Sequence, residues 1–195
     1  HPSGLPELAA LEAAEGWRGW HCENVLWNAL FGLAFWDVLF APVRGAFHHP
    51  FQAAPADLRS PDFARAREGL IAERLARLGE PGEAARLILD THARKRGVAN
   101  AFVAWKALPG DLVEAAVGTL PPGALLAFLE AMARNPAAWR SGFPDLFLCR
   151  EDRCMLWEVK GPGDALRPEQ ERWLGIFNRA GLDARVVWVR YGEEA

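Results

Sequence analysis

Two carboxylates, Asp145 and Glu158, lie in apolar runs joined by a short polar stretch, and their spacing could place them side by side. The runs FPDLF and LWEVK flank REDR, so a hairpin centred between residues 151 and 152 puts Asp145 opposite Glu158. Opposed side chains on neighbouring strands have Cβ atoms about 4.5–5.5 Å apart. At that distance two carboxylates repel each other unless a proton or a cation lies between them. A hard divalent metal, which prefers oxygen ligands, is the expected occupant.

The hairpin register also determines which side chains share the face of Glu158. Because side chains alternate along a strand, Lys160 lies on that face and Val159 points away from it. The ammonium group of Lys160 could balance one carboxylate charge but not two. The register would oppose two further pairs, Phe147 with Leu156 and Cys149 with Cys154.

The three cysteines, Cys22, Cys149 and Cys154, form no CxxC pair and no zinc-binding spacing. This usage is typical of a reducing compartment. We expect Cys149 and Cys154 to be small apolar core residues, although their opposition would permit a disulfide on oxidation. The adjacent His48 and His49 stand in a loop without further ligands nearby, so we interpret them as ordinary loop residues.

Length and composition favour one globular domain, or a core fold that carries one large insertion. The chain has 195 residues, of which 51% are hydrophobic and 24% charged, and a formal net charge of −3. Residues 59–96 hold nine basic and six acidic side chains, which gives them +3 and leaves the rest acidic. Separate acidic and basic surfaces suit a metal-dependent enzyme that acts on a polyanion, although a solvated helix face gives the same count. Most of the nine Trp residues are expected in the core, with base stacking as the alternative.

The order of elements predicts an α/β fold. Residues 1–20 are expected to be a lead-in with a helical patch at 5–16, and residues 22–40 a core helix buried on most sides. Asn28 and Asp37 interrupt that run, which excludes a membrane span there. The other expected elements are a basic amphipathic helix at 61–79, helices near 82–96, 98–107, 111–118 and 121–135, strands at 145–149 and 154–160, a helix at 168–181 and a strand at 184–190. Two antiparallel strands, a crossover helix and a third strand predict a sheet sandwiched by helices.

Glu23 stands in the first turn of the expected core helix. A carboxylate there gains from the helix dipole, which is a sufficient structural reason for its presence. Apolar Val25, Leu26 and Trp27 follow at once, however, which indicates that the first turn also enters the core. A carboxylate buried there needs a partner.

Pro144-Asp145 followed by Glu158-Val159-Lys160 resembles the PD-(D/E)xK nuclease signature. The surrounding GFPDLF, LWEVKGPGD and a helix carrying Gln170 are similar to the VRR-NUC domain, whose pattern includes a glutamine on that helix. Upstream blocks resemble those of the Fanconi-associated nuclease family: EGWRGWHCEN, LFGLAFWDVLF, PFQAAPADL and SPDF. The resemblance runs from about residue 15 to residue 190. It implies a restriction-endonuclease-like core, a mixed sheet flanked by helices, with a helical insertion over 60–140 and a catalytic hairpin, helix and strand over 143–190.

The same resemblance implies a metal site. The glutamate of the family's HCE block corresponds to Glu23, and the family's aspartate, glutamate and lysine match the hairpin residues. One or two Mg²⁺ or Mn²⁺ ions would be held through oxygen, by Glu23, Asp145, Glu158 and the backbone carbonyl of Val159. Lys160 would orient the attacking water or neutralise developing charge on the phosphate. Gln170 would hold the water, Lys160 or a nearby phosphate by hydrogen bonds, or would be a solvated helix residue.

The activity implied by the resemblance is phosphodiester hydrolysis by a structure-specific DNA nuclease of the phosphodiesterase I type. It would be a 5′-flap endonuclease and 5′–3′ exonuclease that acts on branched or flapped DNA in repair, such as interstrand crosslink processing. The family's upstream DNA-binding and helical-repeat regions are not in this sequence, which begins at His1, so we expect the C-terminal nuclease domain of a longer, bacterial-type chain. The expected protein is a monomer without a membrane partner, cytoplasmic with the nucleoid, or nuclear in a eukaryote.

Basic residues outside the metal site are candidates for phosphate contacts that position DNA without reading its sequence. The candidates are the basic residues between 59 and 96 together with Arg140, Arg167 and Arg172. Those assigned to DNA binding are Arg59, Arg65, Arg67, Arg94, Lys95, Arg96, Arg140 and Arg167. Two other functions stay open, namely a dimeric nuclease like a Holliday-junction resolvase or restriction enzyme, and a non-catalytic DNA-binding module. A glycosidase is excluded, because its paired carboxylates flank a sugar and nothing explains Lys160.

Overall fold

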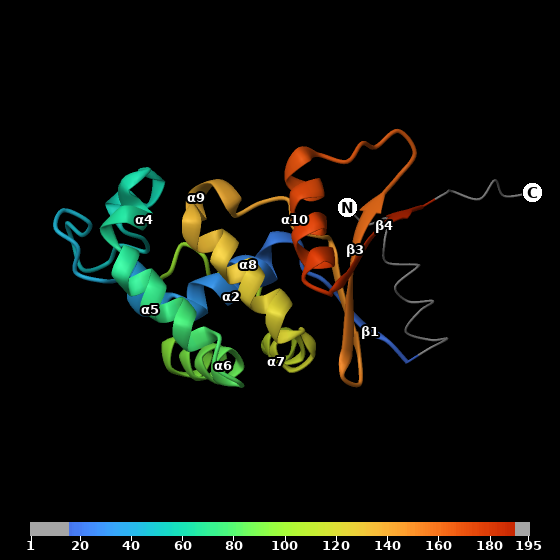
Figure 1. The fold of residues 1–195 in the computed structure, drawn as a ribbon, viewed down its shortest axis with the longest axis horizontal. Coiled ribbons are helices and arrows are strands. Elements are labelled where there is room, and N and C mark those ends of the chain that lie inside the picture. The colour runs from blue at the N-terminus through green and yellow to red at the C-terminus, as the bar shows by residue number, and fades with distance from the viewer. Residues whose placement is uncertain (1–15, 190–195) are drawn as a thin grey trace, which may run out of the picture.

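A mixed four-stranded sheet lies at one end of the molecule, and the described helices pack against one of its faces (Figure 1). The computed structural model describes residues 16–189. The strands and the crossover helix are β1 Arg18–His21, β2 Leu146–Arg150, β3 Arg153–Lys160, α10 Pro168–Arg179 and β4 Asp183–Trp188. The strand order is β1-β2-β3-β4, antiparallel between the first three and parallel between β3 and β4. The α/β class with a mixed sheet is therefore confirmed.

The β2–β3 hairpin has the register that the sequence predicts. Leu146 pairs with Trp157, Phe147 with Leu156 and Cys149 with Cys154. All three cysteines are free, so the opposed Cys149 and Cys154 form no disulfide. Phe147 and Leu156 face the main core, whereas a second small cluster of Leu146, Leu148 and Met155 covers the other face. The expected second helical layer on that face is not found within residues 16–189.

Strand β1 was not predicted. Its first three residues were expected in the lead-in over 1–20, whereas the structure pairs the strand antiparallel with β2, from Arg18 opposite Cys149 to His21 opposite Leu146. The segment is four residues long and contains Gly19, so it lacks the alternation that marks a strand. The segment forms a strand because the edge of β2 that β3 leaves free supplies hydrogen-bonding partners for its backbone. Residues 5–15 of the expected helical patch lie outside the described residues.

The apolar run at 22–40 forms two helices instead of the expected one. They are α2 Glu23–Ala34 and α3 Trp36–Leu39, with the break at Phe35, where φ is −108° and ψ is 20°. The rings of Phe31 and Phe35 stack with centroids 4.9 Å apart, so core packing sustains the bend. Every residue of α2 from Leu26 onward is buried, which accounts for the nearly continuous apolar sequence.

A helical block connects α3 to the hairpin. Its elements are a 3₁₀ helix at Ala56–Arg59, α4 Asp62–Ala66, α5 Glu68–Leu78, α6 Glu83–Lys95, α7 Gly110–Thr119, α8 Pro122–Arg134 and α9 Pro136–Trp139. The helix expected near 98–107 is wrong, since turns and residues without regular secondary structure occupy that range. The Asn100 side chain accepts a bond from the Phe102 amide and donates to the carbonyl of Gly32 in α2, which draws the segment onto the core helix.

The single helix expected at 61–79 is also wrong, because Arg67 interrupts it between α4 and α5. Arg67 is only 1% exposed. Its guanidinium binds both carboxylate oxygens of Asp57, at 2.7 and 3.1 Å, and donates to the carbonyl of Val38. Because the Arg67 guanidinium is buried and bonded within the protein, its position contradicts the prediction that Arg67 contacts DNA phosphate. The guanidinium holds the helical block together instead.

Aromatic packing joins the core helix to the helices on either side of it. The ring of Trp27 in α2 lies 5.1 Å from Phe128 in α8 and 4.5 Å from Phe177 in α10. Phe143, just before the hairpin, stacks on Trp173 of α10 at 4.4 Å. The cluster therefore fixes the start of α2, the entry to β2 and α10 relative to one another. Within residues 16–189, no single helix is long and apolar enough to cross a membrane, and one bent pair, α7 with α8, meets that criterion by length and composition alone.

Candidate metal-binding site

Asp145 holds together two segments that are far apart in the sequence. Its backbone carbonyl accepts hydrogen bonds from the amides of Cys22, at 2.9 Å, and Glu23, at 3.2 Å. These bonds continue the β1–β2 pairing and bring the start of α2 beside the start of β2. The structure thus brings Glu23 and Asp145 together, as the sequence prediction requires.

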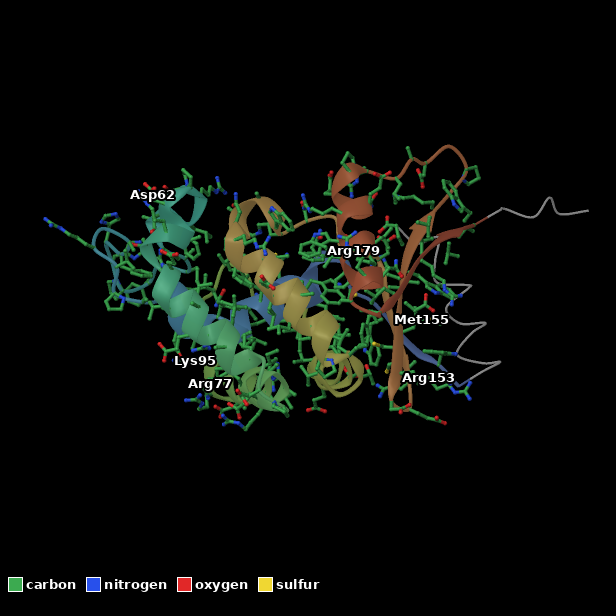
Figure 2. The ribbon with its side chains drawn as sticks, in the orientation of Figure 1. Asp62, Arg77, Lys95, Arg153, Met155 and Arg179 are labelled. Atoms are coloured by element: carbon green, nitrogen blue, oxygen red, sulfur yellow. The ribbon has the colours of Figure 1, made fainter. Side chains whose placement is uncertain are left out.

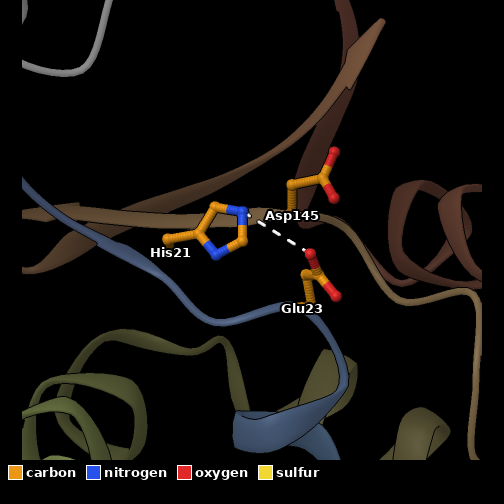
Figure 3. A group of neighbouring side chains, drawn as sticks. All are labelled: His21, Glu23 and Asp145. Atoms are coloured by element: carbon orange, nitrogen blue, oxygen red, sulfur yellow. Dashed lines mark ion pairs between the residues drawn. The ribbon is translucent and has the colours of Figure 1, made fainter. Parts of the chain in front are cut away.

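His21, Glu23 and Asp145 form a group that could hold a metal ion (Figure 3). Each offers one ligand atom, and these atoms lie within 4.8 Å of one another. Nε2 of His21 is 3.6 Å from Oε1 of Glu23. Glu23 has φ of 33°, a conformation that costs a non-glycine residue on the order of 1–3 kcal/mol. Carboxylates and imidazole are common ligands of divalent metals.

His21 was not among the predicted site residues. The sequence feature that could have indicated it is its position two residues before Glu23, which would place both side chains near the same end of a strand. This spacing could not be interpreted because strand β1 was not predicted. The residue is found at the last position of β1, where the strand turns into α2.

The backbone of β3 anchors the carboxylate of Asp145. The amide of Val159 donates to Oδ2 of Asp145 at 2.8 Å. Val159 therefore faces the site through its backbone, as expected for a residue whose side chain points away. This bond links the group of His21, Glu23 and Asp145 to the strand that carries Glu158.

Glu158 is buried, with 1% of its surface exposed, and only one of its two carboxylate oxygens accepts hydrogen bonds among the described residues. Oε1 accepts bonds from Nζ of Lys160, at 2.9 Å, and from Nε2 of Gln170. Oε2 is buried and has no hydrogen-bond partner among the described residues. Burial, with the added repulsion of Asp145, raises the pKa of Glu158 to about 7 even though Lys160 lowers it.

Lys160 and Gln170 complete a buried network around Glu158. Lys160 is 7% exposed and Gln170 4%. Nζ of Lys160 donates to Oε1 of Gln170 at 3.0 Å, and the same oxygen accepts from the backbone amide of Arg167 at 3.0 Å. Gln170 is therefore a buried residue whose amide orients both charged neighbours, not a solvated helix residue.

These residues fit a divalent cation, although they fall into two sets. Glu23 and Asp145 lie with His21, while Glu158 is turned toward Lys160 and Gln170. A buried carboxylate oxygen without a donor, beside a second carboxylate, is costly unless a cation lies nearby. Oxygen atoms dominate the set, which suits hard ions such as Mg²⁺ and Mn²⁺.

The other basic candidates lie in varied surroundings. Arg59, Arg96 and Arg167 are exposed. Two are exposed in ion pairs within a helix, Arg65 with Asp62 at 2.7 Å and Arg94 with Asp90 at 2.6 Å. Such pairs are weak enough to yield to a phosphate.

Lys95 and Arg140 are partly buried. Nζ of Lys95 lies 5.7 Å from the centre of the Trp36 ring. Arg140 donates to the carbonyl of Ala101 at 2.8 Å, and burial together with the nearby charge of Arg59 lowers its pKa. Arg59 and Arg140 thus form a local concentration of positive charge.

Comparisons with known proteins identify the relatives of this chain. The VRR-NUC domain model matches residues 80–191. A Fanconi-associated nuclease 1 homolog from Pseudomonas aeruginosa is 40% identical over 173 residues, which are 88% of this chain and 31% of the relative. One from Arabidopsis thaliana is 32% identical over 181 residues, 90% of this chain and 20% of the relative.

A solved structure shares the fold. The crystal structure of paFAN1 bound to 2nt 5′-flap DNA with a gap superposes with a TM-score of 0.87 at 38% identity, covering 97% of this chain and 35% of that one. The match confirms the PD-(D/E)xK-like fold class. The chain spans about a third or less of the length of these proteins. By both sequence and structure, the chain belongs to the VRR-NUC domain family and resembles the corresponding part of Fanconi-associated nucleases.

Proposed function

We propose that this chain is a metal-dependent DNA nuclease domain that hydrolyses phosphodiester bonds in flapped or branched DNA. The observation that carries the proposal is the meeting of the Glu23 and Asp145 carboxylates beside the buried network of Glu158, Lys160 and Gln170. The crystal structure of paFAN1 on a 5′ flap supports the substrate class. We infer 5′-flap endonuclease and 5′–3′ exonuclease activity of the phosphodiesterase I type, in repair such as interstrand crosslink processing.

One or two Mg²⁺ or Mn²⁺ ions would be held by carboxylate and carbonyl oxygens, with His21 at the margin of the group. The proposed ligands are Glu23, Asp145, Glu158 and the carbonyl of Val159. When bound, such an ion supplies a nucleophile at neutral pH and polarises the scissile phosphate. Glu158 must lose its proton before it can act as a ligand, and its pKa of about 7 puts that step near neutral pH.

Lys160 and Gln170 would act on the phosphate and the water. The ammonium of Lys160 is held between Oε1 of Glu158 and Oε1 of Gln170, so its position is fixed before substrate arrives. From there it can neutralise charge that develops on the phosphate or orient the attacking water. Gln170 keeps Lys160 and Glu158 in place through hydrogen bonds.

Basic residues outside the centre would position the DNA through its backbone phosphates. We retain the candidates that are exposed or partly buried and leave out Arg67. The retained candidates are Arg59, Arg65, Arg94, Lys95, Arg96, Arg140 and Arg167. Arg59 and Arg140 are the strongest candidates for a shared phosphate contact, because the two positive charges lie close enough to repel each other and a phosphate would relieve that repulsion.

We further propose that the domain works as a monomer within a longer chain, next to upstream DNA-binding and helical-repeat regions, wherever cellular DNA is held: the nucleoid-containing cytoplasm, or the nucleus in a eukaryote. The helical block over 60–140 is proposed to be the insertion that favours asymmetric flaps over symmetric junctions. A mass measurement in solution, together with cleavage of flap and four-way-junction DNA, tests this. A homodimer that prefers four-way junctions would contradict it.

The activity is tested with labelled 5′-flap DNA and Mn²⁺, with and without a chelator. Wild-type protein should cut only without the chelator. Asp145→Ala should abolish cutting and leave the fold intact, because the bonds to Cys22 and Glu23 use the backbone carbonyl of Asp145. Asp183→Ala is the matched control, since that aspartate pairs with Arg185 on the surface of β4. Normal cutting by Asp145→Ala would refute the assignment, and DNA binding without any cutting by wild type would favour a non-catalytic module.

A further inference from the structure

Arg172 of α10 has a guanidinium with two buried nitrogens whose donors are unused. Its central carbon lies 4.3 Å from the ring centre of Trp139 and 5.7 Å from that of Trp173. Nε and Nη2 are both buried and have no hydrogen-bond partner among residues 16–189. No ion pair of Arg172 occurs within that range either. The side chain is therefore stacked on indole rings, while one edge of its planar fork has no acceptor.

This arrangement is unusual because charged donors that lose water normally gain an acceptor. An unsatisfied buried donor costs about 1–3 kcal/mol, and more when it carries charge. The edge formed by Nε and Nη2 is the side of a guanidinium that binds a carboxylate or phosphate through two parallel hydrogen bonds. Stacking on Trp139 keeps the guanidinium on the indole face, and such a stacked group can turn within its plane without leaving the ring.

Arg172 lines an open pocket of about 590 Å³ between α8, α9 and α10. Arg134, Trp139 and Arg179 line it too, and Figure 2 labels Arg179 on α10. Three arginines and two glutamates, Glu130 and Glu171, give the pocket one excess positive charge. Because Arg134 is already paired with Glu130 at 2.9 Å, Arg172 and Arg179 are the cations that an incoming anion would meet.

We propose that this pocket binds a backbone phosphate of the DNA substrate, with Arg172 as the forked ligand and Arg179 as a second cation. The inference rests on the proposed nuclease function. Arg172 follows Gln170 by two residues, about 200° around the helix, so it projects from the other side of α10. The phosphate bound here is therefore distinct from the one that Lys160 would contact. Because Nε and Nη2 are covered in the free protein, the guanidinium must turn over the indole face to present them, which stacking allows.

The test is DNA binding without cleavage. Fluorescence anisotropy with labelled 5′-flap DNA, in chelator and over a series of salt concentrations, gives the slope of log K against log salt, which reports the number of phosphate contacts. Arg172→Met should reduce that slope by about 1, and Arg172→Lys by less, because lysine keeps the charge without the fork. Arg185→Met is the matched control and should keep the wild-type slope, since Arg185 is exposed on β4 in a pair with Asp183.

The outcomes separate this inference from the proposed function. Wild-type binding with an unchanged slope in Arg172→Met would overturn the phosphate site alone. No DNA binding by wild type would overturn the proposed function and this inference with it. Urea unfolding of Arg172→Met adds a check. If Arg172 serves the phosphate site, removing its unpaired buried charge should leave the free energy of unfolding equal or higher. If Arg172 is purely structural, the free energy of unfolding should fall while the salt slope of DNA binding stays unchanged. If Arg172→Met does not fold, Arg179→Met must reduce the slope, and an unchanged slope there counts against the site.

Discussion

The backbone amide of Val159 donates a hydrogen bond of 2.8 Å to the carboxylate of Asp145. This bond joins the residue just before β2 to the strand that carries Glu158 and Lys160. A one-residue slip of the hairpin would turn Glu158 to the opposite face and remove it from Lys160 and Gln170. The chemistry of the site thus depends directly on the strand register.

Stability without metal should fall as pH rises, because Glu158 keeps its proton in the folded state. Its pKa is about 7 when folded, against a reference value of 4.5. Below pH 4.5 both states are protonated. Between pH 4.5 and about 7 the unfolded state ionises first, so the free energy of unfolding declines across that window. Urea unfolding in the presence of a chelator, at a series of pH values, measures this decline in the free energy of unfolding.

Glu158→Gln should remove much of that decline while keeping an acceptor for Lys160. Adding Mn²⁺ at pH 7 should stabilise the wild type more than the variant, because an ion favours the ionised carboxylate. The assignment of the raised pKa to Glu158 fails if both proteins lose stability equally between pH 4.5 and 7.

Gln170→Ala should impair catalysis more than folding. The substitution removes the bonds to Lys160 and Glu158, so the ammonium group loses one of its two fixed partners. We expect cleavage to fall about 10–100-fold, as for other residues that orient a metal site, and the free energy of unfolding to fall by about 1–3 kcal/mol. Single-turnover cleavage and urea unfolding give the two values. Wild-type turnover in a folded Gln170→Ala protein would show that the network is structural only.

His21→Ala should weaken metal binding. Nε2 of His21 is 3.6 Å from the Glu23 carboxylate, so the imidazole either contributes a ligand atom or orients Glu23. Loss of such a group typically lowers metal affinity about 10–100-fold. Titration with Mn²⁺ followed by calorimetry measures the affinity, with His48→Ala as the matched control in a surface loop. Equal affinities for both variants would place His21 outside the site.

Gly32→Ala should destabilise the fold. A Cβ atom at Gly32 would lie 2.8 Å from Cβ of Phe102 and 2.9 Å from Cγ2 of Val103, so the 100–103 segment would have to move off α2. Overpacking of this kind costs about 1–3 kcal/mol. Gly118→Ala in α7 is the matched control, because its new Cβ would have no atom within 4 Å and should stabilise the helix by roughly 0.5–1 kcal/mol. Urea unfolding should show opposite signs, and two stabilising changes would contradict the close approach.

Local pattern determined the hairpin, its register and the crossover helix. Two apolar runs on either side of a short polar turn centre the hairpin between residues 151 and 152, and this pairing sets Phe147 opposite Leu156 and fixes the positions of Glu158 and Lys160. Helix α10 was equally clear, because a proline opens it and Gly181 follows it. These elements were predictable because neighbouring residues dictate them.

Tertiary contacts decided the rest. Helices at 22–40 and 61–79 break at Phe35 and Arg67, because ring stacking and a buried ion pair outweigh helix propensity there. The same burial removes Arg67 from the DNA surface.

The amino-acid sequence by itself specified the fold class, the register and which acids and amine could meet. Only the folded chain placed Glu23 beside Asp145, through backbone bonds between β1 and the start of β2, and added His21 to them. The physical reason is that β1 is too short to reveal itself locally and forms on an edge supplied by residues far along the chain.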